Sequence, residues 1–185
     1  MRIFGIDPGS ARTGYGCVES TASRHHLVIC GHLSAPAHAT FPEKLKHIHG
    51  GLTALLARHR PDAVAVEGIF HARNARSALI LGHARGVVLL AACDAGLPVF
   101  EYSPAEVKRA VVGFGRAEKQ QVQQMTKLLL GLQTAPAPFD VSDALAVAIC
   151  HLHTATGIVA QAEALAAPLP GRRAPAVRSW RDYQP

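Results

Sequence analysis

Four carboxylates stand at positions where a folded chain would bring them together. Asp7 ends one predicted strand and Glu67 ends another, and open sheets present functional side chains at the ends of their strands. Asp140 and Asp143 are three residues apart, so they share one face of a helix that starts by Asp140. Carboxylates gathered in this way repel one another unless a cation neutralises them. Such hard oxygen ligands favour Mg²⁺ or Mn²⁺, and two of these ions can support the hydrolysis of a phosphodiester.

Each carboxylate also has a purely structural interpretation. Asp7 precedes a Pro-Gly pair and could serve as a turn residue, while Asp140 or Ser142 could cap the last helix. Glu67 fits such a role less well, because a carboxylate directly after four apolar strand residues is costly to bury without a partner. The pattern alone therefore leaves both a metal site and these structural roles open.

The first half of the chain predicts three strands, a helix and a fourth strand. Strand-like runs at residues 2–7, 15–20 and 26–33 are joined by short connections, which favours an antiparallel meander. Apolar residues then recur at helical spacing over residues 45–61. Residues 63–67 form a short apolar run of the type that is buried in the middle of a sheet, with Glu67 at its end.

The second half predicts alternating helices and one more strand. A long helical stretch over residues 74–95 leads to a strand at residues 98–100. Residues 103–106 combine a capping box with a proline at the first helical position and so begin the next helix. Further helices are expected at residues 118–130 and 140–156. The chain is therefore an α/β protein with the strand and helix order βββαβαβ.

Length and composition predict one globular domain with an anionic partner. At roughly 150 residues per domain, 185 residues make one domain, and 49% hydrophobic with 17% charged residues is a globular composition. The net charge is +6. A metal site would take four of the 13 acidic residues, which leaves nine against nineteen Lys and Arg elsewhere. This distribution predicts an acidic site within an otherwise basic surface. A basic surface of this kind favours a nucleic-acid partner.

Cysteines, histidines and hydropathy argue against several other classes of protein. Among the eleven histidines, pairs such as His151 and His153 are two apart and point to different faces of a helix, so they predict no transition-metal site. No apolar run reaches about 18 residues and no cleavable leader is present, which predicts a cytoplasmic protein without a membrane anchor. The cysteines are too widely spaced for a metal knuckle and are expected to be reduced, buried thiols, at Cys17, Cys30, Cys93 and Cys150.

The end of the chain differs in composition from the rest. After Gly157 the sequence is rich in Ala, Pro and Arg, and it has no periodic apolar face beyond about residue 166. We therefore expect a folded domain over residues 1–157. Residues 158–185 are expected to form a basic tail that is disordered in part.

Several motifs together resemble the RuvC family of bacterial Holliday-junction resolvases. They occur in the order and spacing of that family and cover residues 1 to about 157. The first motif alone is shared with actin-like ATPases and other ribonuclease-H-like proteins, whereas the whole set is specific. The motifs are GIDPGSARTGYG at 5–16, VEGIFHARNARSAL at 66–79 with LGHARG at 81–86, AEKQQV at 117–122 and DVSDALAVAICH at 140–151.

The resemblance implies a fold and an activity. The fold is ribonuclease-H-like, a mixed five-stranded sheet with the first three strands antiparallel and helices on both faces. The activity is that of a homodimeric, metal-dependent endonuclease with two Mg²⁺ or Mn²⁺ ions in each active site. It nicks two strands of a four-way DNA junction symmetrically and leaves 5′-phosphate and 3′-hydroxyl ends. The family also implies a place in DNA recombination and repair beside the RuvA-RuvB branch-migration complex.

The resemblance also assigns roles to residues. The four carboxylates match the metal-binding acidic positions of the family. Lys108 and Lys119 match basic positions associated with activity, and Phe70 matches an aromatic residue associated with opening the junction. Lys119 lies near a helix start, where the dipole does not favour a cation, so a phosphate contact explains it better. Lys108 could instead be a solvated lysine, and Phe70 could be packed under the neighbouring helix.

Further residues near Phe70 are candidates for DNA contact or dimer formation. Arg73 and Arg76 are placed to contact the DNA backbone, although a solvated helix start would also explain them. Gly82 and Gly86 share one helix face, where they would let the same helix of a second subunit approach closely.

The sequence departs from the family pattern at two positions. Gly68 and His83 stand where many relatives have glutamine. These departures leave open the DNA contact after Glu67 and the packing near Gly82.

Two rival functions come from other classes. An actin-like or sugar-kinase ATPase would use the turn after Asp7 to hold phosphates, but it needs two such domains and a longer chain. A junction-binding protein without catalysis would share the basic surface but would have a broken acidic set. The four intact carboxylates argue against this second rival.

Overall fold

A five-stranded mixed sheet organises the part of the chain that the computed structural model describes, residues 1–21, 24–68 and 75–166, with side chains described up to residue 155. The strands lie in the order β3-β2-β1-β4-β5. The first three are antiparallel neighbours, and β4 and β5 run parallel to β1, as expected. Their bounds are β1 (Arg2–Asp7), β2 (Thr13–Thr21), β3 (Arg24–Leu33), β4 (Ala63–Glu67) and β5 (Val99–Tyr102).

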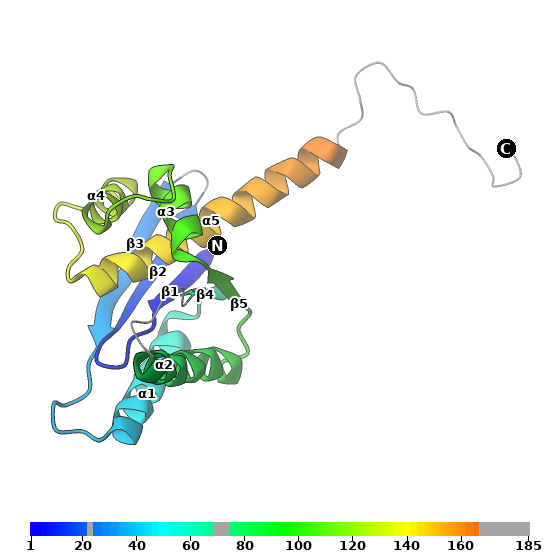
Figure 1. Ribbon diagram of the computed structural model, residues 1–185. Coiled ribbons are helices and arrows are strands. Elements are labelled where there is room, and N and C mark those ends of the chain that lie inside the picture. Colours follow the sequence, from blue (N-terminus) through cyan, green and yellow to red (C-terminus); the bar gives the residue numbers. More distant parts are fainter. Residues whose placement is uncertain (22–23, 69–74, 167–185) are drawn as a thin grey trace, which may run out of the picture. The chain divides into compact units, whose positions relative to one another are not determined.

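Helices cover both faces of the sheet, which confirms the predicted architecture (Figure 1). They are α1 (Phe41–His59), α2 (Ala75–Asp94), α3 (Pro104–Val112), α4 (Lys119–Leu129) and α5 (Phe139–Ala166). The alternation along β1 decides which face each side chain enters. Phe4 and Ile6 pack with residues of α1 and α2, whereas Ile3 packs with residues of α3, α4 and α5. Each face therefore has its own buried core.

Helix α5 lies directly against the backbone of β1 and β2 because glycines face it. A Cβ added at Gly5 would lie 2.0 Å from the Ala144 carbonyl oxygen, and one added at Gly14 would lie 1.9 Å from the Asp140 carbonyl oxygen. No side chain fits at either position. The first turns of α5 are thereby held beside the end of β1, where Asp7 stands.

Replacing Gly14 by Ala is expected to destabilise the protein, because the added methyl must push the start of α5 off the sheet. Overpacking of this kind costs about 1–3 kcal/mol. For a chain of this size each kcal/mol lowers the Tm by roughly 2–4 °C. Gly50→Ala is the matched control, since Gly50 is exposed in α1 with nothing within 4 Å of an added Cβ. Calorimetry should give a lower Tm for Gly14→Ala and an unchanged or higher one for Gly50→Ala. Equal melting of the two variants would contradict the close approach.

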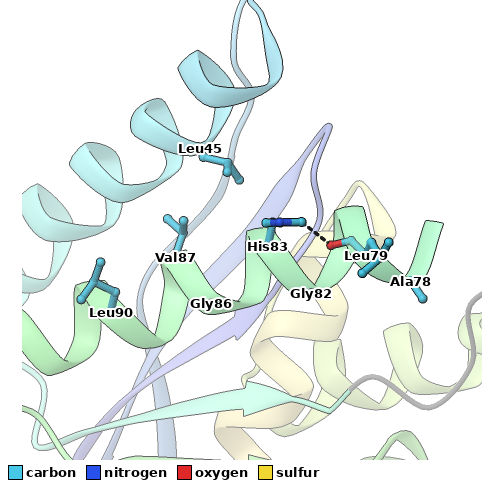
Figure 2. Close-up of a pocket in the computed structure, with 8 residues that line it drawn as sticks. All are labelled: Leu45, Ala78, Leu79, Gly82, His83, Gly86, Val87 and Leu90. Carbon is cyan, nitrogen blue, oxygen red and sulfur yellow. Dashed lines mark hydrogen bonds between the residues drawn. The ribbon is translucent and has the colours of Figure 1, made fainter. Parts of the chain in front are cut away.

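The outward side of α2 is apolar and hollowed. Leu79 and Leu90 are 65% and 53% exposed. Beside them a groove of about 500 Å³ passes Gly82 and Gly86, with Leu45 of α1 on its other side (Figure 2). This apolar groove on α2 lies on the face that the sequence analysis assigned to a second subunit.

By length and composition alone, α2 could also cross a membrane, contrary to the expectation that no segment would reach that length. The criterion is weak, since helices that pack in a protein interior satisfy it too. Arg85, in the middle of α2, forms an ion pair with Glu101 of β5 and is mostly buried against the sheet. The helix is therefore fastened to the domain by a charged contact.

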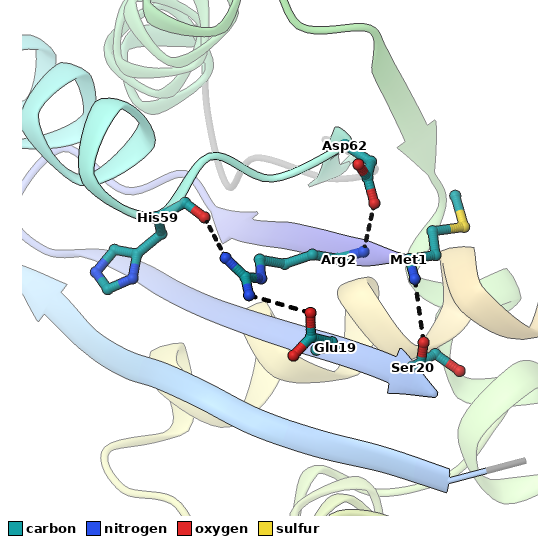
Figure 3. Close-up of polar contacts among 6 residues, drawn as sticks. All are labelled: Met1, Arg2, Glu19, Ser20, His59 and Asp62. Carbon is teal, nitrogen blue, oxygen red and sulfur yellow. Dashed lines mark hydrogen bonds and ion pairs between the residues drawn. The ribbon is translucent and has the colours of Figure 1, made fainter. Parts of the chain in front are cut away.

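A polar network fixes the end of the sheet opposite Asp7 (Figure 3). The Arg2 backbone N–H donates to Asp62 Oδ2 at 2.7 Å, and its guanidinium donates to the His59 carbonyl oxygen at 2.7 Å. The same guanidinium pairs with Glu19 Oε1 at 3.0 Å. These contacts join β1, β2 and the connection from α1 to β4. The positions of β1 and β4 relative to each other are therefore fixed both by the contacts of Arg2 and by the hydrogen bonds between the two strands.

Two expectations drawn from the sequence, on the last helix and on the cysteines, need correction. Helix α5 continues to Ala166 rather than ending near Thr156. The added residues are mostly alanine and other good helix formers, which composition alone had assigned to the tail. Cys93 is exposed on α2 and Cys30 is only partly buried, whereas Cys17 and Cys150 are buried as expected; all four thiols are free. Residues 167–185 lie outside the described part of the chain.

Two compact units divide the chain, Met1–Ala155 and Thr156–Pro185. All the candidate site residues belong to the first unit. The assignment of residues 158–185 to a partly disordered basic tail stays a prediction.

Candidate functional site

Three of the four predicted carboxylates converge. Ile6 and Val66 are paired in the ladder between β1 and β4, so the next residues, Asp7 and Glu67, emerge side by side at the same edge of the sheet. Asp143 approaches them from α5. Carboxylate oxygens of these three residues all lie within 4.8 Å of one another. Among the described residues, no other group of three or more His, Cys, Asp or Glu side chains is this close.

The electrostatics of this acidic group favour a bound cation. Burial, followed by the charges of Glu67 and Asp143, raises the pKa of Asp7 to about 8. Burial and the charge of Asp143 likewise raise the pKa of Glu67 to about 7. The group must therefore retain protons or bind positive charge near neutral pH. Three clustered carboxylates are hard oxygen donors, so this acidic group could bind a divalent metal ion.

Lys119 at the start of α4 supplies one positive charge. Its Nζ donates to Asp143 Oδ2 at 2.9 Å, while its side chain remains 62% exposed. Partial burial lowers the pKa of Lys119, but the hydrogen bond and charge of Asp143 outweigh this effect, and the pKa is raised overall. Lys119 thus sits at the edge of the acidic group with its ammonium facing both Asp143 and solvent.

Lys108 of α3 also acts on the site. Its charge and that of Lys119 lower the pKa of Glu67, against the larger effect of burial. The two lysines predicted to be functional are therefore both close enough to the carboxylates to interact with them electrically.

Asp140 does not join the other three carboxylates in the structure. Its Oδ2 instead pairs with Arg12 Nη1 at 3.4 Å, with both side chains partly exposed. Its charge still contributes to the raised pKa of Asp7. The sequence analysis did not single out Arg12. It lies within the first quoted motif and Asp140 within the last, but the two are 128 positions apart and nothing in the sequence signals that they pair.

Arg85 holds the end of β4, a role that the sequence analysis also missed. Its Nη1 donates to the Glu67 carbonyl oxygen at 3.1 Å. One residue further, Gly68 N–H donates to the Tyr102 carbonyl oxygen at 2.7 Å. A Cβ at Gly68 would lie only 3.3 Å from that same oxygen. Glycine therefore suits this close approach of the chain to β5, which gives a physical reason for one departure from the family pattern.

The remaining predicted residues are only partly placed. Phe70 and Arg73 lie outside the described residues. Arg76 is exposed in the first turns of α2. Gly82 and Gly86 are exposed in the apolar groove on α2, and a Cβ at either would meet nothing within 4 Å.

The histidines form pair contacts rather than a metal cluster within the described residues. His83 is the other departure from the family pattern. Its Nδ1 lies 2.6 Å from the Leu79 carbonyl oxygen, and its ring makes an edge contact with the Phe41 ring. His151 Nδ1 is 2.7 Å from the Tyr102 hydroxyl, whereas His153 Nδ1 is 3.0 Å from the Ala110 carbonyl oxygen. The two therefore have different partners, as their spacing predicted.

Comparison with known proteins adds sequence relatives. The family model described as crossover junction endodeoxyribonuclease RuvC matches residues 3–151. The enzyme of that name from Pelotomaculum thermopropionicum is 54% identical over 153 residues, which is 83% of this chain and 93% of the relative. The one from Heliobacterium modesticaldum is 53% identical over 160 residues, 86% of this chain and 99% of the relative.

Solved structures agree with the fold. The structure of Thermus thermophilus RuvC in complex with Holliday junction substrate superposes with a TM-score of 0.80 at 39% identity, covering 84% of this chain and 94% of the other. The yeast mitochondrial Holliday junction resolvase Ydc2 shares the fold at 13% identity, with a TM-score of 0.62. The expected ribonuclease-H-like fold is thereby confirmed.

Proposed function

Since the chain belongs to the RuvC family of crossover junction endodeoxyribonucleases and is therefore a DNA-cleaving hydrolase, we propose that it resolves four-way DNA junctions by paired symmetrical nicks. The observation that supports this most is the convergence of Asp7, Glu67 and Asp143 beside Lys119. Each nick would leave a 5′-phosphate and a 3′-hydroxyl. The biological setting would be DNA recombination and repair.

The acidic group would hold Mg²⁺ or Mn²⁺. In this proposal Asp7, Glu67 and Asp143 would hold the metal, and Asp140, which pairs with Arg12 in this structure, would be a further ligand. When bound, two such ions supply an activated water and neutralise charge on the leaving 3′-oxygen. The raised pKa values of Asp7 and Glu67 support this, because metal would replace protons that the folded chain otherwise retains.

The basic residues would bind and orient the DNA. Lys119 keeps more than half of its side chain exposed, so its ammonium can reach a phosphate oxygen while it remains beside Asp143. Lys108 would contact the same strand from α3. We assign Phe70 to opening the junction and Arg73 and Arg76 to the neighbouring backbone phosphates, as the family motif implies. The excess of Lys and Arg over the remaining acidic residues would supply most of the affinity.

Paired nicks need two active sites, which a homodimer provides. The apolar groove on α2 supports such an interface, since it exposes Leu79 and Leu90 next to the open positions at Gly82 and Gly86. Without side chains at the two glycines, the same helix of a second subunit can pack closely here (Figure 2).

Replacing Leu90 by Glu is therefore expected to weaken the dimer about 100-fold, because it would bury an unpaired charge worth about 3 kcal/mol. Leu128→Glu is the matched control, as Leu128 is 69% exposed on α4, outside the groove. Sedimentation equilibrium measures the dissociation constant of each variant. A Leu90→Glu protein that dimerises like wild type would contradict this interface.

Further parts of the proposal concern the setting of the enzyme. We place the protein in the cytoplasm, working beside the RuvA-RuvB branch-migration complex. Residues 1–157 would form the nuclease domain, and residues 158–185 would make loose contacts with DNA or a partner.

The proposed function is tested with a labelled synthetic four-way junction and a linear duplex of the same sequence. The purified chain is incubated with each DNA in Mg²⁺ or in EDTA. We expect paired nicks in the junction only, and only with metal. Equal cutting of both DNAs would contradict junction selectivity, and tight junction binding without cutting in any metal would favour a binding protein.

A further inference from the structure

An exposed aromatic ring borders the acidic group, and the sequence analysis gave it no role. Phe139 is the first residue of α5, four positions before Asp143, and remains 37% exposed. It belongs to neither of the two buried clusters that hold the helices on the sheet. The ring is therefore not part of either core, and a little over a third of it is open to solvent.

The ring is linked to the acidic group through Lys119. Lys119 Nζ lies 6.0 Å from the centre of the Phe139 ring while it donates to Asp143 Oδ2 at 2.9 Å. The ammonium thus lies between a carboxylate of the acidic group and an exposed aromatic face. At 6.0 Å the cation–π contact is at the limit of its range, so it does not account for the exposure of the ring.

We propose that Phe139 is a stacking surface for the base next to the cleaved phosphate. The inference rests on the proposed cleavage of DNA at the acidic group. A phosphate bound by Lys119 carries its base only one sugar away. The Phe139 ring is partly exposed, and its centre lies 6.0 Å from the same ammonium. A base attached to that phosphate could therefore reach the ring.

The chemistry of the neighbourhood favours a base over other ligands. Lysine contacts phosphate without reading sequence, whereas an aromatic face binds the flat face of any base and binds large bases more strongly. Phe100 offers a contrast on β5, because its ring is also exposed but already packs on His151, with ring centres 4.4 Å apart. Phe139 has no such ring partner among the described residues, only Lys119.

The test removes the ring and the base in turn. Wild type, Phe139→Leu and Phe139→Trp are compared in single-turnover cleavage of an intact junction in Mg²⁺. Each is also given junctions with an abasic nucleotide on the 5′ or the 3′ side of the cut phosphate. Leu keeps the apolar bulk and Trp keeps an aromatic face, so packing and stacking make different predictions.

We expect Phe139→Leu to cut the intact junction about 5- to 100-fold more slowly, the range that stacking of one base supports. Phe139→Trp should cut at nearly the wild-type rate. On the junction that lacks the base which stacks on Phe139, wild type and Phe139→Leu should cut at equal rates. An equal slowing of Phe139→Leu on intact and abasic junctions would overturn the proposal in favour of support for Lys119, and no slowing would also overturn it.

A second readout needs no cleavage. With 2-aminopurine at the stacked position and EDTA present, wild type should quench its fluorescence on binding and Phe139→Leu should not. Equal quenching by both would overturn the stacking. If wild type fails to cut the intact junction in Mg²⁺, the proposed function fails together with this inference, whereas normal cutting by Phe139→Leu removes the inference alone.

Discussion

Replacing Asp7 by Asn is expected to abolish junction cleavage while leaving junction binding intact. Asp7 belongs to the acidic group, and the charges of Glu67, Asp143 and Asp140 all raise its pKa. An amide there removes one anionic ligand. Loss of an outer partner of a metal ligand already costs about 10- to 100-fold, so loss of a direct ligand should slow cleavage by at least about 100-fold. Binding should persist because Lys and Arg contacts to phosphate supply most of the affinity.

Single-turnover cleavage in Mg²⁺ and gel-shift titration in EDTA measure these two effects separately. Asp94→Asn is the matched control, because Asp94 is an exposed carboxylate that pairs with His49 on the α1–α2 layer. It should cleave and bind like wild type. Loss of binding by Asp7→Asn with the fold retained would contradict the separation of cleavage from binding.

Metal-free protein is expected to become less stable as the pH rises from about 6 to about 8. Folding raises the pKa of Asp7 from 3.8 to about 8 and that of Glu67 from 4.5 to about 7. The folded chain therefore keeps protons that the unfolded chain has released. The resulting stability is fully present below the unfolded pKa values and is lost as the pH rises through the folded values.

The size of this loss is up to about 1.4 kcal/mol per pH unit for each retained proton. It should lower the Tm in EDTA by roughly 3–10 °C between pH 6 and pH 8. Mg²⁺ should restore more stability at pH 8 than at pH 6, because at the lower pH it must displace protons. Calorimetry over this range with and without Mg²⁺ measures both effects.

Asp7→Asn provides the control for the pH experiment. With one titrating carboxyl removed, the metal-free variant should melt higher than wild type at pH 8 and should depend less on pH. A variant whose Tm falls with pH as steeply as that of wild type would show that the acidic group is not the source of the dependence.

The strands and helices could be predicted because their signals are local. The apolar runs before Asp7 and Glu67 become neighbouring parallel strands, and that pairing alone places the two carboxylates together. The capping box at the start of α3 is likewise present, with Ser103 Oγ accepting from the Glu106 N–H at 3.3 Å. Such features depend on residues that are close in the sequence or follow a fixed period.

The details of the site could not be predicted because they depend on contacts between distant residues. The helical spacing of Asp140 and Asp143 is correct, yet only Asp143 joins the acidic group, while Asp140 pairs with Arg12. Lys119 pairs with Asp143, a contact between residues 24 positions apart that the sequence did not reveal; its contact with phosphate stays a prediction. Arg85 lies within the quoted LGHARG segment, but its contacts with Glu67 and Glu101 join residues that are far apart in the sequence. Phe139 lies outside every quoted motif. Each of these contacts depends on the direction in which a side chain points, and the spacing of residues along the sequence does not determine that direction.

The central claim is that Asp7, Glu67 and Asp143 hold the metal that cleavage requires, and crystals soaked in Mn²⁺ test it most directly. Anomalous scattering locates manganese without any assumption about activity. We predict a manganese peak among these three carboxylates in wild type, and a weak or absent peak in Asp143→Asn crystals. Manganese bound elsewhere with no density at the acidic group of wild type would contradict the claim.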